Sequence, residues 1–356
     1  MSLEPAIAES AMPLAFDPSR GRLCLDVRDL RIHFGSTSAL RKSKMGIVRA
    51  VDGISFTVAE GETVGLVGES GCGKSTLGRA ILRAHRPTAG IVNYRPRDSE
   101  DWIDLASADD RTLAKYRTDL RLIFQDPFTS LNPRQTVLQA IGQPLFTKGV
   151  PRPEVVERVA DMMRRVGLRP EYMSRYPHAF SGGERQRIVI ARALVVRPHI
   201  VVADEAVSAL DVSVRAQTLN LLQELQDEFH LTYLFVSHDL SVVKLVSDYI
   251  AVMYAGRLVE FSRSEEMFHR PRHPYTAALI AAIPIPSPER RGRVRARLEG
   301  EVPDPAKPPK GCLFNPRCPF ATDLCRTLEP RMRALADGRQ VACHYAETIE
   351  LKGIVA

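Results

Sequence analysis

The stretch GESGCGKST at residues 68–76 decides the fold of this chain. Its residues Gly68, Gly73, Lys74 and Ser75 fit the pattern G-x-x-x-x-G-K-[ST], in which glycines let the backbone turn its N–H groups toward an anion. An apolar stretch, TVGLV, comes directly before it, and helix-forming residues follow. This order predicts a phosphate cradle, with the lysine at the β- and γ-phosphates of a nucleotide and the serine hydroxyl on Mg²⁺. The loop residues expected to contact the nucleotide are Gly68, Glu69, Ser70, Gly71, Cys72, Gly73, Lys74, Ser75 and Thr76.

Apolar stretches of strand length recur along the chain and alternate with helical patterns. Strands are predicted at residues 23–33, 50–58, 63–67, 120–124, 200–203 and 232–236. Helices are predicted at residues 75–85, 154–166 and 214–230. Because strands that alternate with helices favour a parallel sheet, the expected fold class is α/β.

The stretch HIVVADEAVSALD at residues 199–211 supplies the acids that nucleotide hydrolysis needs. Asp204 ends an apolar strand, and a carboxylate at that place can hold Mg²⁺ beside a phosphate loop. Glu205 follows at once and can polarise an attacking water. His238, in FVSHD, ends another apolar strand and is a candidate contact of the γ-phosphate. Together these residues predict that the bound nucleotide is hydrolysed.

Composition and charge limit the classes of protein to which the chain can belong. Its 356 residues are 44% hydrophobic and 26% charged, which is ordinary for a globular protein. No run of about 18 uncharged apolar residues occurs, and the first residues, MSLEPAIAES, lack the pattern of a secretory signal. A cytosolic chain without a membrane span is therefore expected. The net charge of +7 leaves a role on nucleic acid open.

A further stretch, FSGGERQR at residues 180–187, resembles the signature of ATP-binding-cassette (ABC) ATPases. Gln125 in LIFQDP resembles the Q-loop of this family, SALD at residues 208–211 its D-loop, and His238 its switch histidine. The motifs also follow one another in the order of the family, and the resemblance covers roughly residues 23–270. It implies a P-loop NTPase fold, namely a RecA-like core with an antiparallel β-subdomain and a helical subdomain.

The resemblance also implies how these motifs work. Two such domains face each other head to tail with two ATP molecules between them, so that Ser181 and Gly183 would contact the nucleotide of the partner. The catalytic residues that it implies are Glu205, His238 and Gln125. The ligands of Mg²⁺ that it implies are Ser75, Gln125 and Asp204. Beyond the phosphate loop, the expected nucleotide contacts are Ser181, Gly182, Gly183, Glu184, Asp211 and, as a candidate to stack on adenine, Phe34.

A finer resemblance is to the ATPase subunits of bacterial oligopeptide and dipeptide importers. It is carried by AVDGISF, VGESGCGKSTLGRAIL, FQDPFTSLNPR, RYPHAFSGGERQRIVIARAL, HPYTAAL and GEVPDPAKPPKGCLFNPRCPFATDLC. It implies a peripheral subunit on the cytoplasmic face of the inner membrane that drives peptide uptake. The partners that it implies are two transmembrane permease subunits, a second ABC ATPase, favoured as a paralogue, and an extracytoplasmic solute-binding protein, with no nucleic acid. Nickel importers share this subfamily, so the cargo stays open, as does the choice between homodimer and heterodimer.

Three residues depart from the family pattern. Glu184 stands where the signature usually ends in Gln, Ala206 where a Pro follows the Asp-Glu pair, and Ala179 where an acid precedes the signature. Glu184 accepts hydrogen bonds as Gln does but adds negative charge near the partner's nucleotide. A modest effect on the rate of hydrolysis is therefore expected.

Four cysteines, Cys312, Cys318, Cys325 and Cys343, lie near the C-terminus with 5, 6 and 17 residues between them. Zinc ribbons contain closer pairs, and ferredoxin motifs are also tighter, so the spacing leaves both a metal site and incidental thiols open. The resemblance implies a [4Fe–4S] cluster, with zinc or no metal as alternatives. The other two cysteines, Cys24 and Cys72, are expected to be small core residues.

The composition changes along the chain and predicts three parts. Residues 1–22 are expected to be a flexible tail, and residues 23–270 an ATPase domain whose helical subdomain spans about 126–190. Residues 271–356 are expected to form a connector rich in Pro and Arg, followed by the cysteine-containing module. The connector includes an arginine run that could be a solvated linker or could contact a membrane or a partner, at Arg290, Arg291, Arg293, Arg295 and Arg297.

Three other functions fit parts of the sequence. A soluble ABC ATPase acting on nucleic acid agrees with the positive charge, but SLNPR, HPYT and the cysteine tail argue against it. A non-hydrolysing regulatory subunit would have no need of Lys74, Asp204, Glu205 and His238 together. An ABC exporter half would carry a fused membrane segment.

Overall fold

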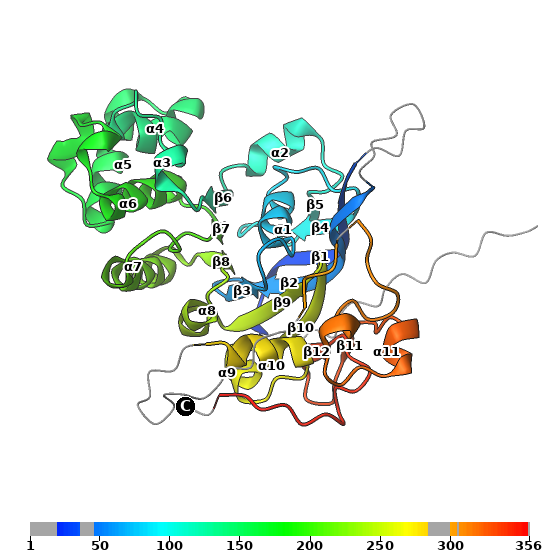
Figure 1. The fold of residues 1–356 in the computed structure, drawn as a ribbon. Coiled ribbons are helices and arrows are strands. Elements are labelled where there is room, and N and C mark those ends of the chain that lie inside the picture. The colour runs from blue at the N-terminus through cyan, green and yellow to red at the C-terminus, as the bar shows by residue number, and fades with distance from the viewer. Residues whose placement is uncertain (1–19, 36–45, 284–299, 305, 355–356) are drawn as a thin grey trace, which may run out of the picture.

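The computed structural model describes residues 20–35, 46–283, 300–304 and 306–354. Within them the chain forms two β-sheets, a group of helices that stands to one side, and a C-terminal segment of short elements (Figure 1). The larger sheet has the strand order β11-β12-β10-β9-β3-β8-β7-β6, and the smaller has the order β2-β1-β4-β5. The predicted α/β class is confirmed.

Parallel strands form the middle of the larger sheet. The pairs β9–β3, β3–β8, β8–β7 and β7–β6 are all parallel, whereas β10, β12 and β11 add antiparallel strands at one edge. Strands β3, β7, β8 and β9 are buried along their whole length, as expected for a parallel sheet covered on both faces. The strands are β3 Thr63–Val67, β6 Leu120–Ile123, β7 Ile200–Asp204, β8 Thr232–Val236, β9 Tyr249–Tyr254, β10 Arg257–Arg263, β11 Arg333–Ala334 and β12 Gln340–Val341.

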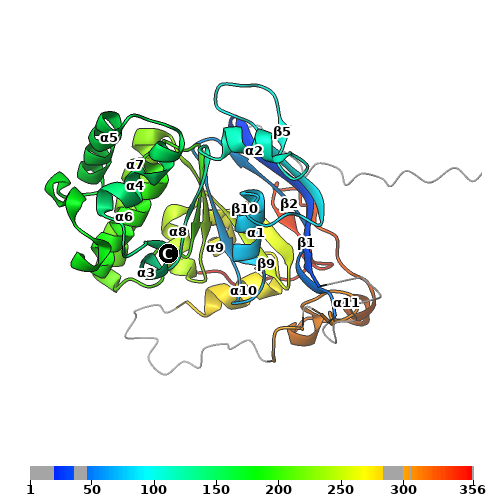
Figure 2. The same ribbon diagram turned by 90° about the horizontal axis from the view of Figure 1, so that it is seen from above.

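The smaller sheet is entirely antiparallel. Its strands are β1 Leu23–Phe34, β2 Val48–Ala59, β4 Ala89–Tyr94 and β5 Ile103–Asp104. The apolar side chains of β1 and β2 share one core cluster with β3 and with helix α1 Lys74–Ile81, so the smaller sheet supports the helix that follows the phosphate loop. Figure 2 shows α1 between this sheet and the group of helices.

The group of helices is inserted between β6 and β7. It consists of α3 Pro127–Ser130, α4 Val137–Thr147, α5 Arg152–Arg165 and α6 Gly182–Leu194, with two short 3-10 turns. A capping box starts α4, because the Thr136 hydroxyl accepts from the Gln139 N–H while the Gln139 side chain accepts from the Thr136 N–H. In Figure 1 these helices, in green, stand apart from α1 and from the smaller sheet.

The remaining helices cover the larger sheet or lie in the C-terminal segment. They are α2 Asp110–Tyr116, α7 Val212–Phe229, α8 Leu240–Val246, α9 Ser264–His269, α10 Pro274–Ala281 and α11 Asp323–Thr327. Strand β12 pairs with β10, so the last part of the chain extends the larger sheet. Strand β9, YIAVMY, was not predicted although it is as apolar as the strands that were.

Parts of the predicted tail and connector lie outside the described residues. Residues 1–19 and the arginine run from Arg290 to Arg297 belong to these parts. Arg20 is described, however, and its guanidinium is bound to Glu62 and Thr57. Arg20 is thus tied to β2 and to the turn that precedes β3.

Within the described ranges, no helix combines the length and the apolar character that crossing a bilayer requires.

Buried polar groups hold the start of helix α10. The Glu260 carboxylate on β10 accepts the N–H groups of Arg272 at 2.8 Å and of His273 at 2.9 Å. The His273 ring caps the helix, since its Nδ1 accepts the Tyr275 N–H at 3.1 Å. Burial raises the pKa of Glu260 to about 7 and lowers the pKa of His273 to about 3. The capping nitrogen of His273 is thus a neutral acceptor.

We expect His273 to make the stability of the chain dependent on pH. Its pKa is lower in the folded chain than in the unfolded chain, so its contribution is present above about pH 6.5 and is lost as the pH falls toward 3. The His273→Asn variant keeps an acceptor at the helix cap but does not titrate. The unaltered chain should therefore lose about 2 kcal/mol of unfolding free energy relative to this variant between pH 7 and pH 5, measured by urea denaturation.

Glu260 changes the stability in the opposite direction to His273, because its raised pKa favours the folded state as the pH falls below 7. It is present in both chains, so its effect largely cancels in the comparison. The matched control is His230→Asn, since His230 is exposed and Asn tolerates its left-handed φ of 52°. A constant difference between the unaltered chain and His273→Asn across this pH range would contradict the prediction.

Candidate nucleotide-binding and hydrolysis site

The phosphate loop joins the end of β3 to the start of α1. Gly68 has a φ of 151°, and a Cβ there would lie 2.2 Å from the Met253 carbonyl oxygen. Gly73 has a φ of 103°, and a Cβ there would lie 2.0 Å from the Ala50 carbonyl oxygen. Both contacts are with backbone, which cannot move aside as a flexible side chain can. Only glycine fits these two places, and the loop can therefore curl closely around an anion.

Lys74 and Ser75 occupy the first turn of α1. The buried Lys74 ammonium donates to the carbonyl oxygens of Gly68 at 2.8 Å and Glu69 at 2.9 Å. The Ser75 hydroxyl donates to Asp204 Oδ1 at 2.7 Å, at the end of β7. A hydroxyl next to a carboxylate provides the oxygen ligands that Mg²⁺ prefers. The oxygen ligands of Ser75 and Asp204, together with the glycines of the phosphate loop, thus suit a magnesium–nucleotide complex.

Gln125, Glu205 and His238 come together although they are far apart in the sequence. Gln125 Nε2 donates to Glu205 Oε2 at 2.8 Å, and His238 Nδ1 lies 3.2 Å from Glu205 Oε1. These residues follow β6, β7 and β8, which are neighbouring parallel strands, so their carboxyl ends meet at one edge of the sheet. Two of the three residues predicted as catalytic, Gln125 and His238, thus lie within hydrogen-bond distance of the carboxylate of the third, Glu205.

Glu205 has a strained backbone. Its φ is 49°, in the left-handed region that a non-glycine residue seldom adopts. Its N–H donates to the Val236 carbonyl oxygen at 2.9 Å, and its own carbonyl oxygen accepts from the Ser208 hydroxyl at 2.9 Å. These bonds hold the strained turn and direct the carboxylate toward Gln125 and His238. Strain that is maintained in this way is frequent at functional residues.

The signature residues form the start of α6. The Ser181 hydroxyl accepts from the Glu184 N–H at 3.3 Å, and Glu184 Oε2 accepts from the Ser181 N–H and from its hydroxyl, both at 2.8 Å. The bonds from Ser181 lower the pKa of Glu184. Glu184 therefore closes a capping box, a role that Gln can also fill.

The other predicted nucleotide contacts come from the starts of α6 and α7 and from the end of β1. Gly182 and Gly183 open α6 in the group of helices, which Figure 1 shows apart from α1. Asp211 caps α7 by accepting the Val214 N–H at 3.0 Å. Phe34 ends β1, is 43% exposed and packs edge-on against His85 with ring centres 5.8 Å apart.

Two contacts of Glu69 were not foreseen. Its N–H donates to the Tyr275 hydroxyl at 2.9 Å, and its carboxylate pairs with Arg317 at 2.6 Å. Both partners come from the last third of the chain. The sequence did contain a signal for the second contact. Glu69 is an acid inside an anion-binding loop, and such a residue requires a nearby positive charge.

The four C-terminal cysteines line one small cavity together with His273, Phe314 and His344. Among the described residues, which include all four cysteines, no three His, Cys, Asp or Glu side chains are arranged to hold a metal ion. This finding overturns the predicted [4Fe–4S] cluster, and zinc is not supported in its place. Burial raises the pKa of Cys312, Cys318 and Cys343 to about 11, so these thiols are protonated at neutral pH. Spacing in the sequence carried no information on the directions of the sulfur atoms.

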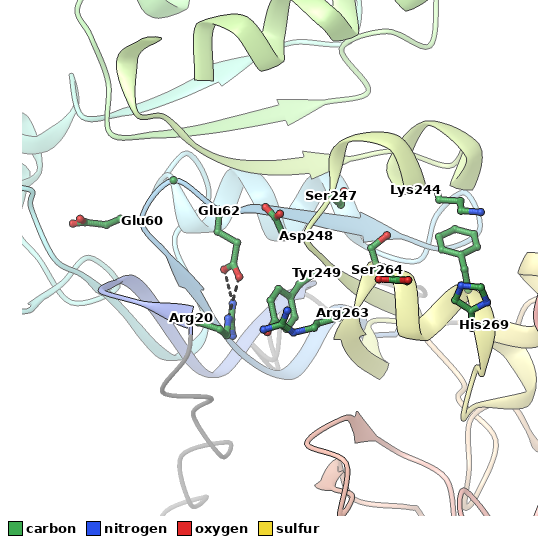
Figure 3. Close-up of a pocket in the computed structure, with 13 residues that line it drawn as sticks. Arg20, Glu60, Glu62, Lys244, Ser247, Asp248, Tyr249, Arg263, Ser264 and His269 are labelled. Carbon is green, nitrogen blue, oxygen red and sulfur yellow. Dashed lines mark hydrogen bonds and ion pairs between the residues drawn. The ribbon is translucent and has the colours of Figure 1, made fainter. Parts of the chain in front are cut away.

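A polar pocket lies at the other end of the parallel strands, beside the first residues of β3 and β9 (Figure 3). Arg20, Glu62, Asp248 and Lys244 are among the residues that line it. Figure 3 shows the Arg20 guanidinium paired with the Glu62 carboxylate. The phosphate loop follows the carboxyl end of β3, so this pocket is separate from the candidate site.

Solved structures and a family model support the class that this fold and site define. The chain is similar to cbiO1 from Clostridium perfringens, described as part of the ABC transporter complex cbiONQ, with 26% identity and a TM-score of 0.59 over 69% of this chain and 91% of that one. It is similar to MJ0796, described as a bacterial ABC transporter cassette, with 27% identity and a TM-score of 0.57 over 67% of this chain and 98% of that one. Residues 51–208 match the family model described as ABC transporter. The class is that of the ABC ATPases, which bind ATP with Mg²⁺ and hydrolyse it.

Curated relatives and a second family model narrow this class. Residues 259–325 match the model described as oligopeptide/dipeptide transporter, C-terminal region. The oligopeptide transport ATP-binding protein AppF of Bacillus subtilis is 46% identical over 90% of this chain and 96% of its own length. The dipeptide transport ATP-binding protein DppF of Haemophilus influenzae is 49% identical over 84% of this chain and 90% of its own length. This chain belongs to the family of ABC transporter ATP-binding proteins that carry the oligopeptide/dipeptide transporter C-terminal region.

Proposed function

We propose that this chain is the ATP-hydrolysing subunit of an importer for di- and oligopeptides. The observation that carries the proposal is the similarity to peptide transport ATP-binding proteins over nine tenths of the chain, including its C-terminal region. The hydrogen-bonded group of Gln125, Glu205 and His238 supports hydrolysis as the source of energy. The peptide itself would be bound by other subunits.

In this proposal each residue of the site has a separate task. The Lys74 ammonium binds the β- and γ-phosphates, and the loop N–H groups surround them. Ser75 and Asp204, joined by a 2.7 Å hydrogen bond, would hold Mg²⁺, which neutralises phosphate charge when it is bound. Glu205 accepts a proton from the attacking water, and Gln125 and His238 keep its carboxylate in place.

The signature residues act across a dimer in this proposal. Ser181, Gly182, Gly183 and Glu184 begin α6, whose N-terminal N–H groups carry the positive end of the helix dipole. Figure 1 shows α6 in the group of helices, apart from α1, the helix that Lys74 begins. A second ATPase subunit would therefore supply the matching half of each site. We favour a paralogue as this second subunit.

The remaining partners follow from the same resemblance. Two transmembrane permease subunits would contact the group of helices on the cytoplasmic face of the inner membrane. An extracytoplasmic solute-binding protein would deliver the peptide. Binding of two ATP molecules would close the ATPase dimer, and hydrolysis would open it, so that the permease subunits alternate between two states.

Co-purification in the native host tests this function. The tagged Glu205→Gln chain is purified with ATP in mild detergent, and the proteins that accompany it are identified by mass spectrometry. We expect two polytopic membrane proteins and a second ABC ATPase. The complex that contains the unaltered chain is then reconstituted in vesicles with its solute-binding protein, and uptake of labelled dipeptides and of Ni²⁺ is compared. Uptake of Ni²⁺ alone would refute the peptide cargo, and nucleic acid without membrane proteins would refute transport.

A further inference from the structure

Glu69 of the phosphate loop is paired with an arginine from the C-terminal segment. Arg317 NH1 donates to Glu69 Oε2 at 2.6 Å, and NH2 donates to Glu69 Oε1 at 2.9 Å, so both oxygens of the carboxylate are bound. The Arg317 side chain is 4% exposed and that of Glu69 is 26% exposed. Bidentate pairs of this kind are the strongest ion pairs and also fix orientation. The pair joins positions 248 residues apart in the sequence.

The backbone of Glu69 is held from two sides as well. Its N–H donates to the hydroxyl of Tyr275 on α10 at 2.9 Å. Its carbonyl oxygen accepts from Lys74 Nζ at 2.9 Å. One residue thus connects the phosphate-binding lysine with α10 and with the segment that contains Arg317. A displacement of Arg317 or Tyr275 would be passed to Lys74 through a single residue.

A buried aromatic cluster fixes the two partners of Glu69 relative to each other. The rings of Tyr275 and Tyr254 are 4.6 Å apart, and Phe314 lies 5.4 Å from Tyr275 and 5.3 Å from Tyr254. All three side chains are at most 1% exposed. Arg317 follows Phe314 by three residues and also donates to the Tyr254 hydroxyl at 3.4 Å. The end of β9, α10 and the Arg317 segment therefore form one packed unit.

The ion pair between Glu69 and Arg317 does more than attach the C-terminal segment, because Glu69 carries a negative charge within the phosphate loop. A carboxylate inside a loop that binds phosphates repels its ligand, and the repulsion is strong where water is excluded. Arg317 neutralises that carboxylate and also prevents it from rotating freely. Without the arginine, an unpaired negative charge would remain five positions before Lys74.

We propose that Arg317 is a positioning residue for the phosphate loop, by which the C-terminal segment sets the affinity of the site for ATP. It neutralises Glu69 and, together with Tyr275, keeps the loop in the conformation that presents Lys74 to the phosphates. The inference rests on the proposed role of residues 68–76 as the ATP site. The C-terminal segment, which carries the cysteine-lined cavity, would thereby regulate ATP binding from outside the ATPase core.

The test compares ATP binding and turnover in variants of the full chain. For Arg317→Ala we expect the KM for ATP and the Kd of a fluorescent ATP analogue to rise roughly 5- to 20-fold, with kcat changed less than about threefold. The double variant Arg317→Ala with Glu69→Gln removes the unpaired charge and should regain most of the affinity. A role confined to fastening the segment would leave the double variant as weak as the single one, and that result would overturn the proposal.

Controls separate this inference from loss of fold and from failure of the proposed function. Arg333→Ala removes another bidentate pair of the same segment, with Glu347, and should leave ATP affinity unchanged. If Arg317→Ala unfolds at a lower temperature, Arg317→Lys, which keeps the charge but not the fork, should show an intermediate Kd. Lys74→Ala should lose binding of the analogue. Normal binding by Lys74→Ala would refute the proposed ATP site, whereas its loss together with an unchanged Kd for Arg317→Ala would refute only the role of Arg317.

Discussion

Replacing Lys74 by Ala should lower ATP turnover of the assembled complex by about 10²- to 10³-fold. Lys74 is the buried cation of the phosphate loop, and its ammonium is held by the carbonyl oxygens of Gly68 and Glu69. Alanine removes the positive charge that these two carbonyl groups hold in place. The loop N–H groups that remain cannot replace this charge, so ATP binding should be lost together with hydrolysis.

The measurement is steady-state phosphate release at saturating ATP, with the same variants assayed for uptake. Lys115→Ala is the matched control, because Lys115 is an exposed lysine on α2 and should give normal turnover. Thermal unfolding of both variants checks that the fold is retained. Turnover of Lys74→Ala within twofold of the unaltered complex would show that the nucleotide is bound elsewhere.

Replacing Glu205 by Gln should leave ATP bound but slow its hydrolysis by about 10²- to 10⁴-fold. The amide is nearly the same size as the carboxylate and can still accept the bond from Gln125 Nε2, so the geometry of the site should be kept. It cannot take a proton from water at neutral pH. The closed ATPase dimer should therefore accumulate in the presence of ATP.

Two measurements together check this second prediction. Phosphate release reports the rate, and the retention of labelled ATP by the complex reports binding. Glu224→Gln is the matched control, because Glu224 is an exposed acid on α7. Normal turnover by Glu205→Gln would mean that another residue activates the water, and loss of ATP binding would mean that Glu205 serves mainly to shape the site.

Much of the fold could be predicted because its signals are local. A glycine that must adopt a positive φ, a lysine next to it and an apolar strand before it lie within about a dozen residues, and local sterics then require a turn followed by a helix. The strands 63–67 and 232–236 were predicted with the bounds that the structure gives them. The helix after the phosphate loop is shorter than expected and ends at Ile81 instead of His85.

Other features could not be predicted from local pattern. The order of the motifs suggested a hydrolysis site, but no spacing could show that Gln125 and His238 meet at the Glu205 carboxylate. Likewise, four cysteines in 32 positions suggested a cluster, whereas the folded chain lines a cavity with them without arranging them as ligands. Ligand geometry depends on side-chain directions, and these follow from packing.

The sequence by itself determined the class of this protein, because the phosphate loop, the Asp-Glu pair and the signature are short motifs whose chemistry depends on neighbouring residues. The tertiary structure alone decided which distant residues act together. It placed the ends of β6, β7 and β8 at one edge of the sheet, and it placed Arg317 and Tyr275 against Glu69. The physical reason is that contacts between distant parts of a chain are selected by burial and charge pairing in the whole fold, and no local pattern contains that information.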